Sequence, residues 1–209
     1  MKNLKKYILL LCILSSATIL AQTQTSNSSI QEAANKGKTE LLRILSERSD
    51  FKLGVSASDI DGSETGNPIE EFSTDFKKLL NNQAQDLLSI STRTEKFIVP
   101  LLKNGKVMTT ITVASTPRST KTVELVNRQY TSEINQMPRA TYIKDLKLIQ
   151  VPNLNAALYV TGNTVFTSYK GRNIQEPVSL SELTAELQSD ARIFESKYGE
   201  KLRKGKLVR

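Results

Sequence analysis

The chain has 209 residues, with 29 Lys+Arg against 21 Asp+Glu, one cysteine, and neither histidine nor tryptophan. The absence of histidine excludes Ser-His-Asp and Cys-His catalysis and an imidazole zinc site. The nine glycines never fall into the spacing of a dinucleotide-binding or phosphate-binding loop. Any catalysis would therefore depend on carboxylates, tyrosines and lysines.

The N-terminus has the charged, apolar and small-residue order of a secretory signal peptide. Three lysines within residues 2–6 precede the apolar run 7–14, and small residues follow as far as Ala21. The apolar run is shorter than the roughly 20 residues that a membrane-spanning helix needs. We predict export to the periplasm or the exterior, with cleavage after Ala21 in preference to Ala17.

Cleavage after Ala21 leaves 188 residues (209 minus 21), with 26 Lys+Arg (29 minus 3) against 21 Asp+Glu. It also removes Cys12, so an exported chain would have no disulfide and its stability would come from its core. A net charge of about +5 is moderate and bears on solubility and non-specific binding. Export and 6% aromatic residues argue against nucleic-acid recognition, and no segment after residue 21 has the length and apolarity of a membrane span.

Five segments are expected: a signal peptide (1–21), a disordered lead (22–29), a helix and polar loop (30–66), an α+β core (67–199) and a basic C-terminal tail (200–209). The first helix extends from Ile30 to about residue 47, with Gly37 weakening its middle by about 1 kcal/mol relative to alanine. A second helix is predicted over 68–89, because its apolar residues recur in steps of three and four.

Residues 96–102 and 106–114 are β-prone and flank Asn104-Gly105, the strongest short-range signal for a hairpin. A two-residue loop would pair Leu102 with Val107 and Ile98 with Ile111, while Pro100 favours an outward-facing amide or a bulge.

Residues 122–126 fit either a third strand or the start of a helix, and we favour a strand followed by a helix from Arg128 to Gln136, ended by Pro138. Strands are predicted over 147–151 and 156–160, with a bulge at Pro152-Asn153. A turn at 161–163 then leads into strand 164–169 as a second hairpin.

A last helix is capped by Ser179 or Ser181 and ends before Gly199. The expected fold is therefore α+β, an antiparallel sheet built from two hairpins, or a meander, packed against helices. Its element order resembles that of PAS/Cache-like and cystatin-like domains in architecture alone, which carries no function.

The polar stretch before the predicted second helix places oxygen donors at positions 1, 3, 5, 7, 9 and 12 of an EF-hand loop: Asp59, Asp61, Ser63, Thr65, Asn67 and Glu70. Two departures weaken a calcium site made by Asp59, Asp61, Ser63 and Glu70. The glycine required at position 6 is Glu64, and Pro68 stands at position 10. We favour the alternative, in which Asn67 caps a helix that begins at Pro68.

The C-terminal tail carries Lys201, Arg203, Lys204 and Lys206, which could meet an anionic surface or simply suit the negative end of a helix. We predict an exported, non-catalytic domain that binds a small molecule or a protein, without cofactor. The alternatives are a carboxylate-dependent hydrolase acting on glycan-type substrates and a calcium-stabilised secreted domain. Two buried carboxylates about 5–10 Å apart in one cleft would favour the hydrolase, and an apolar pocket without convergent acids would favour binding.

Overall fold

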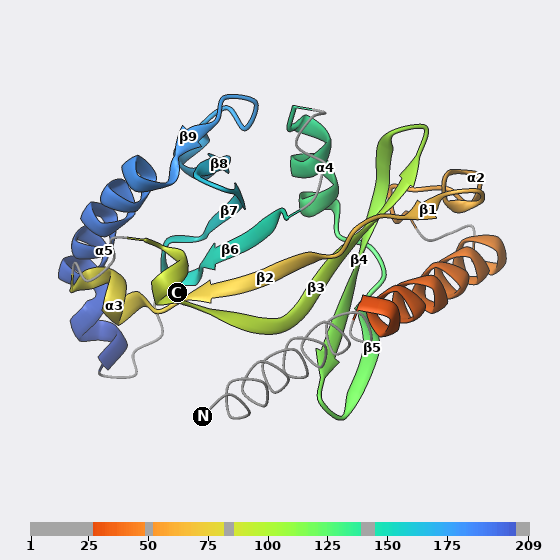
Figure 1. The fold of residues 1–209 in the computed structure, drawn as a ribbon, viewed down its shortest axis with the longest axis horizontal. Helices are drawn as coiled ribbons and strands as arrows, with labels where there is room; N and C mark the ends of the chain where they lie inside the picture. Colours follow the sequence, from red (N-terminus) through yellow and green to blue (C-terminus); the bar gives the residue numbers. More distant parts are fainter. Residues whose placement is uncertain (1–26, 49–51, 82–85, 139–144, 204–209) are drawn as a thin grey trace, which may run out of the picture.

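The computed structural model of the protein describes residues 27–48, 52–81, 86–138 and 145–203. Within these ranges the chain forms an α+β fold, in which one mostly antiparallel nine-stranded sheet packs against helices (Figure 1). The predicted fold class is confirmed. The predicted signal peptide at 1–21 lies outside the described residues.

The described helices are the N-terminal helix (residues 27–47), α2 (Ala57–Ile60), α3 (Phe76–Leu80), α4 (Arg128–Gln136) and α5 (Leu180–Arg203), with short 3-10 turns η1 (Leu88–Ile90), η3 (Pro152–Leu154) and η4 (Tyr169–Gly171). The strands are β1 (Glu64–Thr65), β2 (Ile69–Thr74), β3 (Ser91–Lys103), β4 (Lys106–Thr116), β5 (Ser119–Glu124), β6 (Lys147–Val151), β7 (Ala156–Thr161), β8 (Thr164–Phe166) and β9 (Val178–Ser179).

The strand order is β5-β4-β3-β2-β6-β7-β8-β9, and β1 pairs with the far end of β3. Neighbouring strands are antiparallel except β2 and β6, which run parallel with Glu71 opposite Leu148. This pair joins the two halves of the sheet, because β2 also pairs with β3. Strand β5 forms one edge of the sheet.

The two faces of the sheet have different covers. Ile98 packs with α4, while its neighbours Phe97 and Val99 pack with the N-terminal helix, so these two helices lie on opposite faces. On β6, Leu148 likewise faces α4 and Ile149 faces α5. The N-terminal helix and α5 therefore cover opposite ends of one face of the sheet, and α4 covers the other face (Figure 1).

The hairpin predicted at Asn104-Gly105 is confirmed. Both turn residues have positive φ, at 53° and 71°, as a type I′ turn requires. Leu102 lies opposite Val107 as predicted, but a bulge then shifts the register, so that Val99 rather than Ile98 faces Ile111. The bulge falls beside Pro100, whose carbonyl accepts a hydrogen bond from Gly66 N in the break between β1 and β2.

The helix predicted over 68–89 is wrong. Residues 69–74 form β2, α3 begins only at Phe76, and Asp75 rather than Asn67 is the N-cap of a helix here, accepting from the amides of Lys77 and Lys78. The apolar residues that suggested one helix are divided between two elements, β2 and then α3. Pairing with β3 and β6, both remote in sequence, makes the first half a strand.

Other boundaries also moved. Residues 27–29, predicted to be disordered, are already helical, and the predicted polar loop contains α2 and β1. The strand at 122–126 and the helix Arg128–Gln136 are confirmed as β5 and α4. Pro152 begins a turn that reverses the chain between β6 and β7 instead of a bulge. Helix α5 continues through Gly199 to Arg203.

No helix in the described part of the chain combines the length and apolarity that crossing a membrane requires.

Candidate functional site

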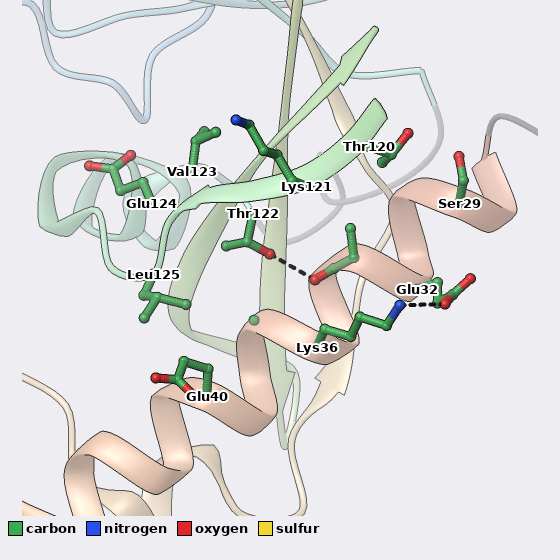
Figure 2. A pocket seen from close by; sticks show the side chains of 12 residues that line it. Ser29, Glu32, Lys36, Glu40, Thr120, Lys121, Thr122, Val123, Glu124 and Leu125 are labelled. Atoms are coloured by element: carbon green, nitrogen blue, oxygen red, sulfur yellow. Dashed lines mark hydrogen bonds and ion pairs between the residues drawn. The ribbon is translucent and has the colours of Figure 1, made fainter. Parts of the chain in front are cut away.

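A groove of about 710 Å³ lies between the N-terminal helix and strand β5 (Figure 2). Its lining comes from residues 29–40 of the helix and residues 120–125 of β5 and the segment after it. The volume falls in the range of about 300–1,000 Å³ typical of ligand pockets. We call this hollow the helix–β5 groove.

Small residues form the helix side of the groove. Ser29, Ala33 and Gly37 follow one another at four-residue intervals, which places them in a single row along the helix. Gly37 also allows the helix to approach β5, because a Cβ there would lie 2.8 Å from the side-chain oxygen of Thr122. Thr122 Oγ1 donates a 2.8 Å hydrogen bond to the Ala33 carbonyl and fixes this approach (Figure 2).

Strand β5 forms the other side, and among the described residues its outer edge has no neighbouring strand. Figure 2 shows Thr122 pointing toward the helix and Lys121 and Val123 pointing away from it. Val123 is the extra residue of a β-bulge, since Thr122 lies opposite Val113 and Glu124 opposite Thr112. Val123 is 49% exposed.

The acidic side chains on the helix side are neutralised locally. Glu32 forms a 2.7 Å ion pair with Lys36, and Glu40 forms a 2.6 Å ion pair with Arg43. The hydrogen bonds from these cations lower the pKa of both glutamates. A general acid in a glycosidase needs a raised pKa, so these two carboxylates are poorly suited to that role.

On the strand side, Glu124 accepts a 2.8 Å hydrogen bond from Thr112 Oγ1 and has no cation partner among the described residues. Its position at the end of β5 places a negative charge near the apolar side chain of Leu125, which also lines the groove.

A second hollow of about 360 Å³ contains two carboxylates, Glu70 and Asp145. Glu70 forms a 3.1 Å ion pair with Arg93, and Asp145 is exposed. Neither carboxylate therefore has the buried, apolar setting that creates a general acid.

The structure does not bring the four predicted calcium ligands together. Asp59 forms a capping box with Ser56 at the start of α2, and the Ser63 hydroxyl donates to the Ile60 carbonyl at 2.7 Å. Glu70 pairs with Arg93, and Asp61 is the C-cap of α2. Among the described residues, no cluster of three or more candidate ligands could hold a metal ion.

Lysine ammonium groups donate hydrogen bonds to backbone carbonyls between Ser58 and Ser63. Lys103 Nζ donates to the carbonyl oxygens of Ser58 and Asp61, at 2.6 and 2.8 Å, and Lys38 Nζ donates to that of Ser63. These bonds place two positively charged ammonium groups beside Asp61 and Ser63, where a calcium ion would need to bind.

The predicted basic tail is only partly described. Lys201 is exposed in the last turn of α5, and Arg203 is the final helical residue. Lys204 and Lys206 lie outside the described residues.

A buried carboxylate, Glu133, holds α4 to the sheet. It accepts hydrogen bonds from Tyr159 Oη at 2.8 Å, Ser168 Oγ at 3.0 Å and Gln129 Nε2 at 3.2 Å. Burial, followed by the charge of Glu133, raises the pKa of Tyr159 well above its ordinary value. Because these hydrogen bonds join α4 to β7 and to the segment after β8, we assign Glu133 a structural role.

Comparison with known proteins gave no match, whether to a family model, to a curated protein or to a solved structure.

Sequence reasoning missed the groove, although one of its features was visible. Gly37 stood out as a helix-weakening residue, and the row Ser29, Ala33, Gly37 could have indicated a close approach. The partner of that approach, Thr122, lies 85 residues further along the chain (122 minus 37), and no local pattern connects the two.

Proposed function

We propose that the protein is an exported, non-catalytic interaction domain whose partner binds in the helix–β5 groove. The observation that carries this proposal is the groove itself, a hollow of about 710 Å³ beside β5, the edge strand of the described sheet. Export rests on the order of charged, apolar and small residues at the N-terminus.

The chemistry of the groove supports binding more than hydrolysis. Glu32 and Glu40 are ion-paired with lowered pKa values, and Ala33, Val123 and Leu125 supply apolar surface. Ligand sites combine apolar walls with a few polar groups, and this groove has that composition.

Site-specific photo-crosslinking in the producing cells tests the proposal. A photoreactive residue at Val123 would lie at the groove, and one at Ile193 provides a matched control, because both side chains are 49% exposed. We expect Val123 to give a discrete crosslinked species and Ile193 to give none. Absence of a crosslink at Val123, or the same product from both positions, would refute the proposal.

A further inference from the structure

We infer that the partner of the helix–β5 groove is an extended peptide segment that adds a strand to the edge of β5. This inference rests on the proposed function and specifies its occupant. Its basis is the direction of the backbone groups along β5, which follows from the turn that precedes the strand.

Pro117 and Arg118 form a two-residue turn between β4 and β5, so Thr116 and Ser119 flank the loop and form the first hydrogen-bonded pair. Hydrogen-bonded and non-hydrogen-bonded pairs alternate along an antiparallel ladder. The pairs made by Thr120 and Thr122 are therefore non-hydrogen-bonded, and the N–H and C=O groups of these two residues point away from β4.

The first hairpin shows how the protein itself pairs such an outward-facing residue at a buried position. Lys103 and Lys106 flank the turn at Asn104-Gly105, so Val107 stands in the position that Thr120 has in the second hairpin. The side-chain amide of Asn135 satisfies Val107 on both sides, accepting from Val107 N at 3.0 Å and donating to Val107 O at 2.7 Å. The protein itself thus covers this edge with an amide group.

No described segment does the same for β5. Among the described residues, no element other than β4 forms a hydrogen bond with the backbone N–H or C=O of Thr120 or Thr122. The groove lies directly beside this edge, and residues 29–40 of the N-terminal helix form its other side. A peptide backbone carries the amide and carbonyl groups that the edge needs, and alternate side chains of the peptide would face the helix.

The charges and the bulge define the occupant further. Because Glu32 and Glu40 already carry their own cations, the helix wall favours apolar side chains at alternate positions of the peptide. The bulge at Val123 interrupts the regular ladder, so pairing with a peptide is confined to residues 119–122. The charge of Lys121 on this short edge disfavours non-specific pairing with other strands. The peptide would contribute about three or four paired residues, since Thr120 and Thr122 are about 7 Å apart along the strand.

The test uses the mature chain and a phage-displayed library of random 12-residue peptides. Enriched peptides are synthesised with a fluorophore, and their affinity is measured by anisotropy for the wild type, Thr120→Pro and Ser115→Ala. Both variants lose the 2.9 Å contact between Thr120 Oγ1 and Ser115 Oγ, but only proline removes the outward N–H, and Ser115 does not line the groove. We expect Ser115→Ala to bind like the wild type and Thr120→Pro to bind at least tenfold more weakly.

A second readout modifies the peptide and leaves the protein intact. N-methylation at alternate peptide positions should weaken binding at least tenfold, and methylation one residue along should change it less than about twofold. A library that yields no binder, equal affinity for Thr120→Pro, or indifference to the position of the methyl group would each overturn the inference. So would a dimer of the free protein that Thr120→Pro dissociates, because a second copy would then occupy the edge.

The two proposals fail separately. Val123 could crosslink to another protein that binds the wild type and Thr120→Pro with equal affinity. That result would support the proposed function and refute strand addition. Absence of that crosslink would remove both.

Discussion

Asn135 offers the sharpest test of how the sheet is held, because one side chain substitutes for a missing strand. Its amide exchanges two hydrogen bonds with the backbone of Val107, beyond the end of β5, and Val107 is 1% exposed. Asn135→Ala would leave a buried N–H and C=O without partners, at a cost of about 1–3 kcal/mol each when water cannot replace the bond.

Asn135 is half-buried, so water would recover part of this loss, and alanine gains about 0.6 kcal/mol in helix propensity. We therefore expect a net loss of about 2–3 kcal/mol in the free energy of unfolding. With a urea dependence of about 2 kcal/mol per molar, the midpoint of denaturation would fall by about 1–1.5 M.

Urea denaturation followed by circular dichroism measures the effect, with Gln136→Ala as the control. Gln136 is exposed on the same helix and bonds only to Ser132 Oγ at 2.9 Å, so its loss should cost less than about 0.5 kcal/mol. Asn135→Asp keeps an acceptor for Val107 N but loses the donor, and protonation of the new carboxyl would restore that donor. Its deficit relative to the wild type should therefore shrink in acid. A loss for Asn135→Ala no larger than that for Gln136→Ala would refute the assigned role.

Three further outcomes follow from the contacts of the structure. Gly37→Ala should lower the melting temperature, although alanine has the better helix propensity. The new Cβ would lie 2.8 Å from Thr122 Oγ1 and introduce about 1–3 kcal/mol of strain. A rise in melting temperature would contradict the close approach of the helix to β5. Burial, and then neighbouring glutamate charge, raises the pKa of Tyr130 from 10.0 to about 12, so the stability it contributes is complete below pH 10 and is lost as the pH rises toward 12. Tyr130→Phe should flatten part of the alkaline decline in a pH series of melts, and an unchanged decline would show that other groups account for it. Millimolar calcium should leave the melting temperature unchanged, and a calcium-dependent rise that Asp59→Ala/Asp61→Ala abolishes would restore the metal site.

The sequence alone determined the elements whose signals are local. Asn104-Gly105 specified its hairpin, because positive φ at both central residues is a property of the turn and needs no distant partner. The helix Arg128–Gln136 was likewise bounded by Asn127, which caps it through a bond to Tyr130 N, and by Pro138. The α+β class followed from the order of these elements.

Only the tertiary structure decided the fate of residues 68–89. Their apolar spacing fits a helix, yet Ile69–Thr74 lies between β3 and β6 as a central strand. The hydrogen bonds of a strand come from other segments, and here one partner is more than 70 residues away in the chain (147 minus 70). A periodic pattern within one segment cannot report such pairing, because burial on both faces of a sheet makes alternation disappear.

The candidate site, too, was decided only by the tertiary structure. Local composition explained why Asp59 and Asn67 looked meaningful, since both are residues that cap helices and initiate turns. The groove instead arises where a helix and an edge strand, encoded about 80 residues apart, approach across Gly37, and within the described part of the chain one side of β5 has no partner strand. Proximity of that kind is created by packing, so the sequence contained the small residues but not the surface that they form.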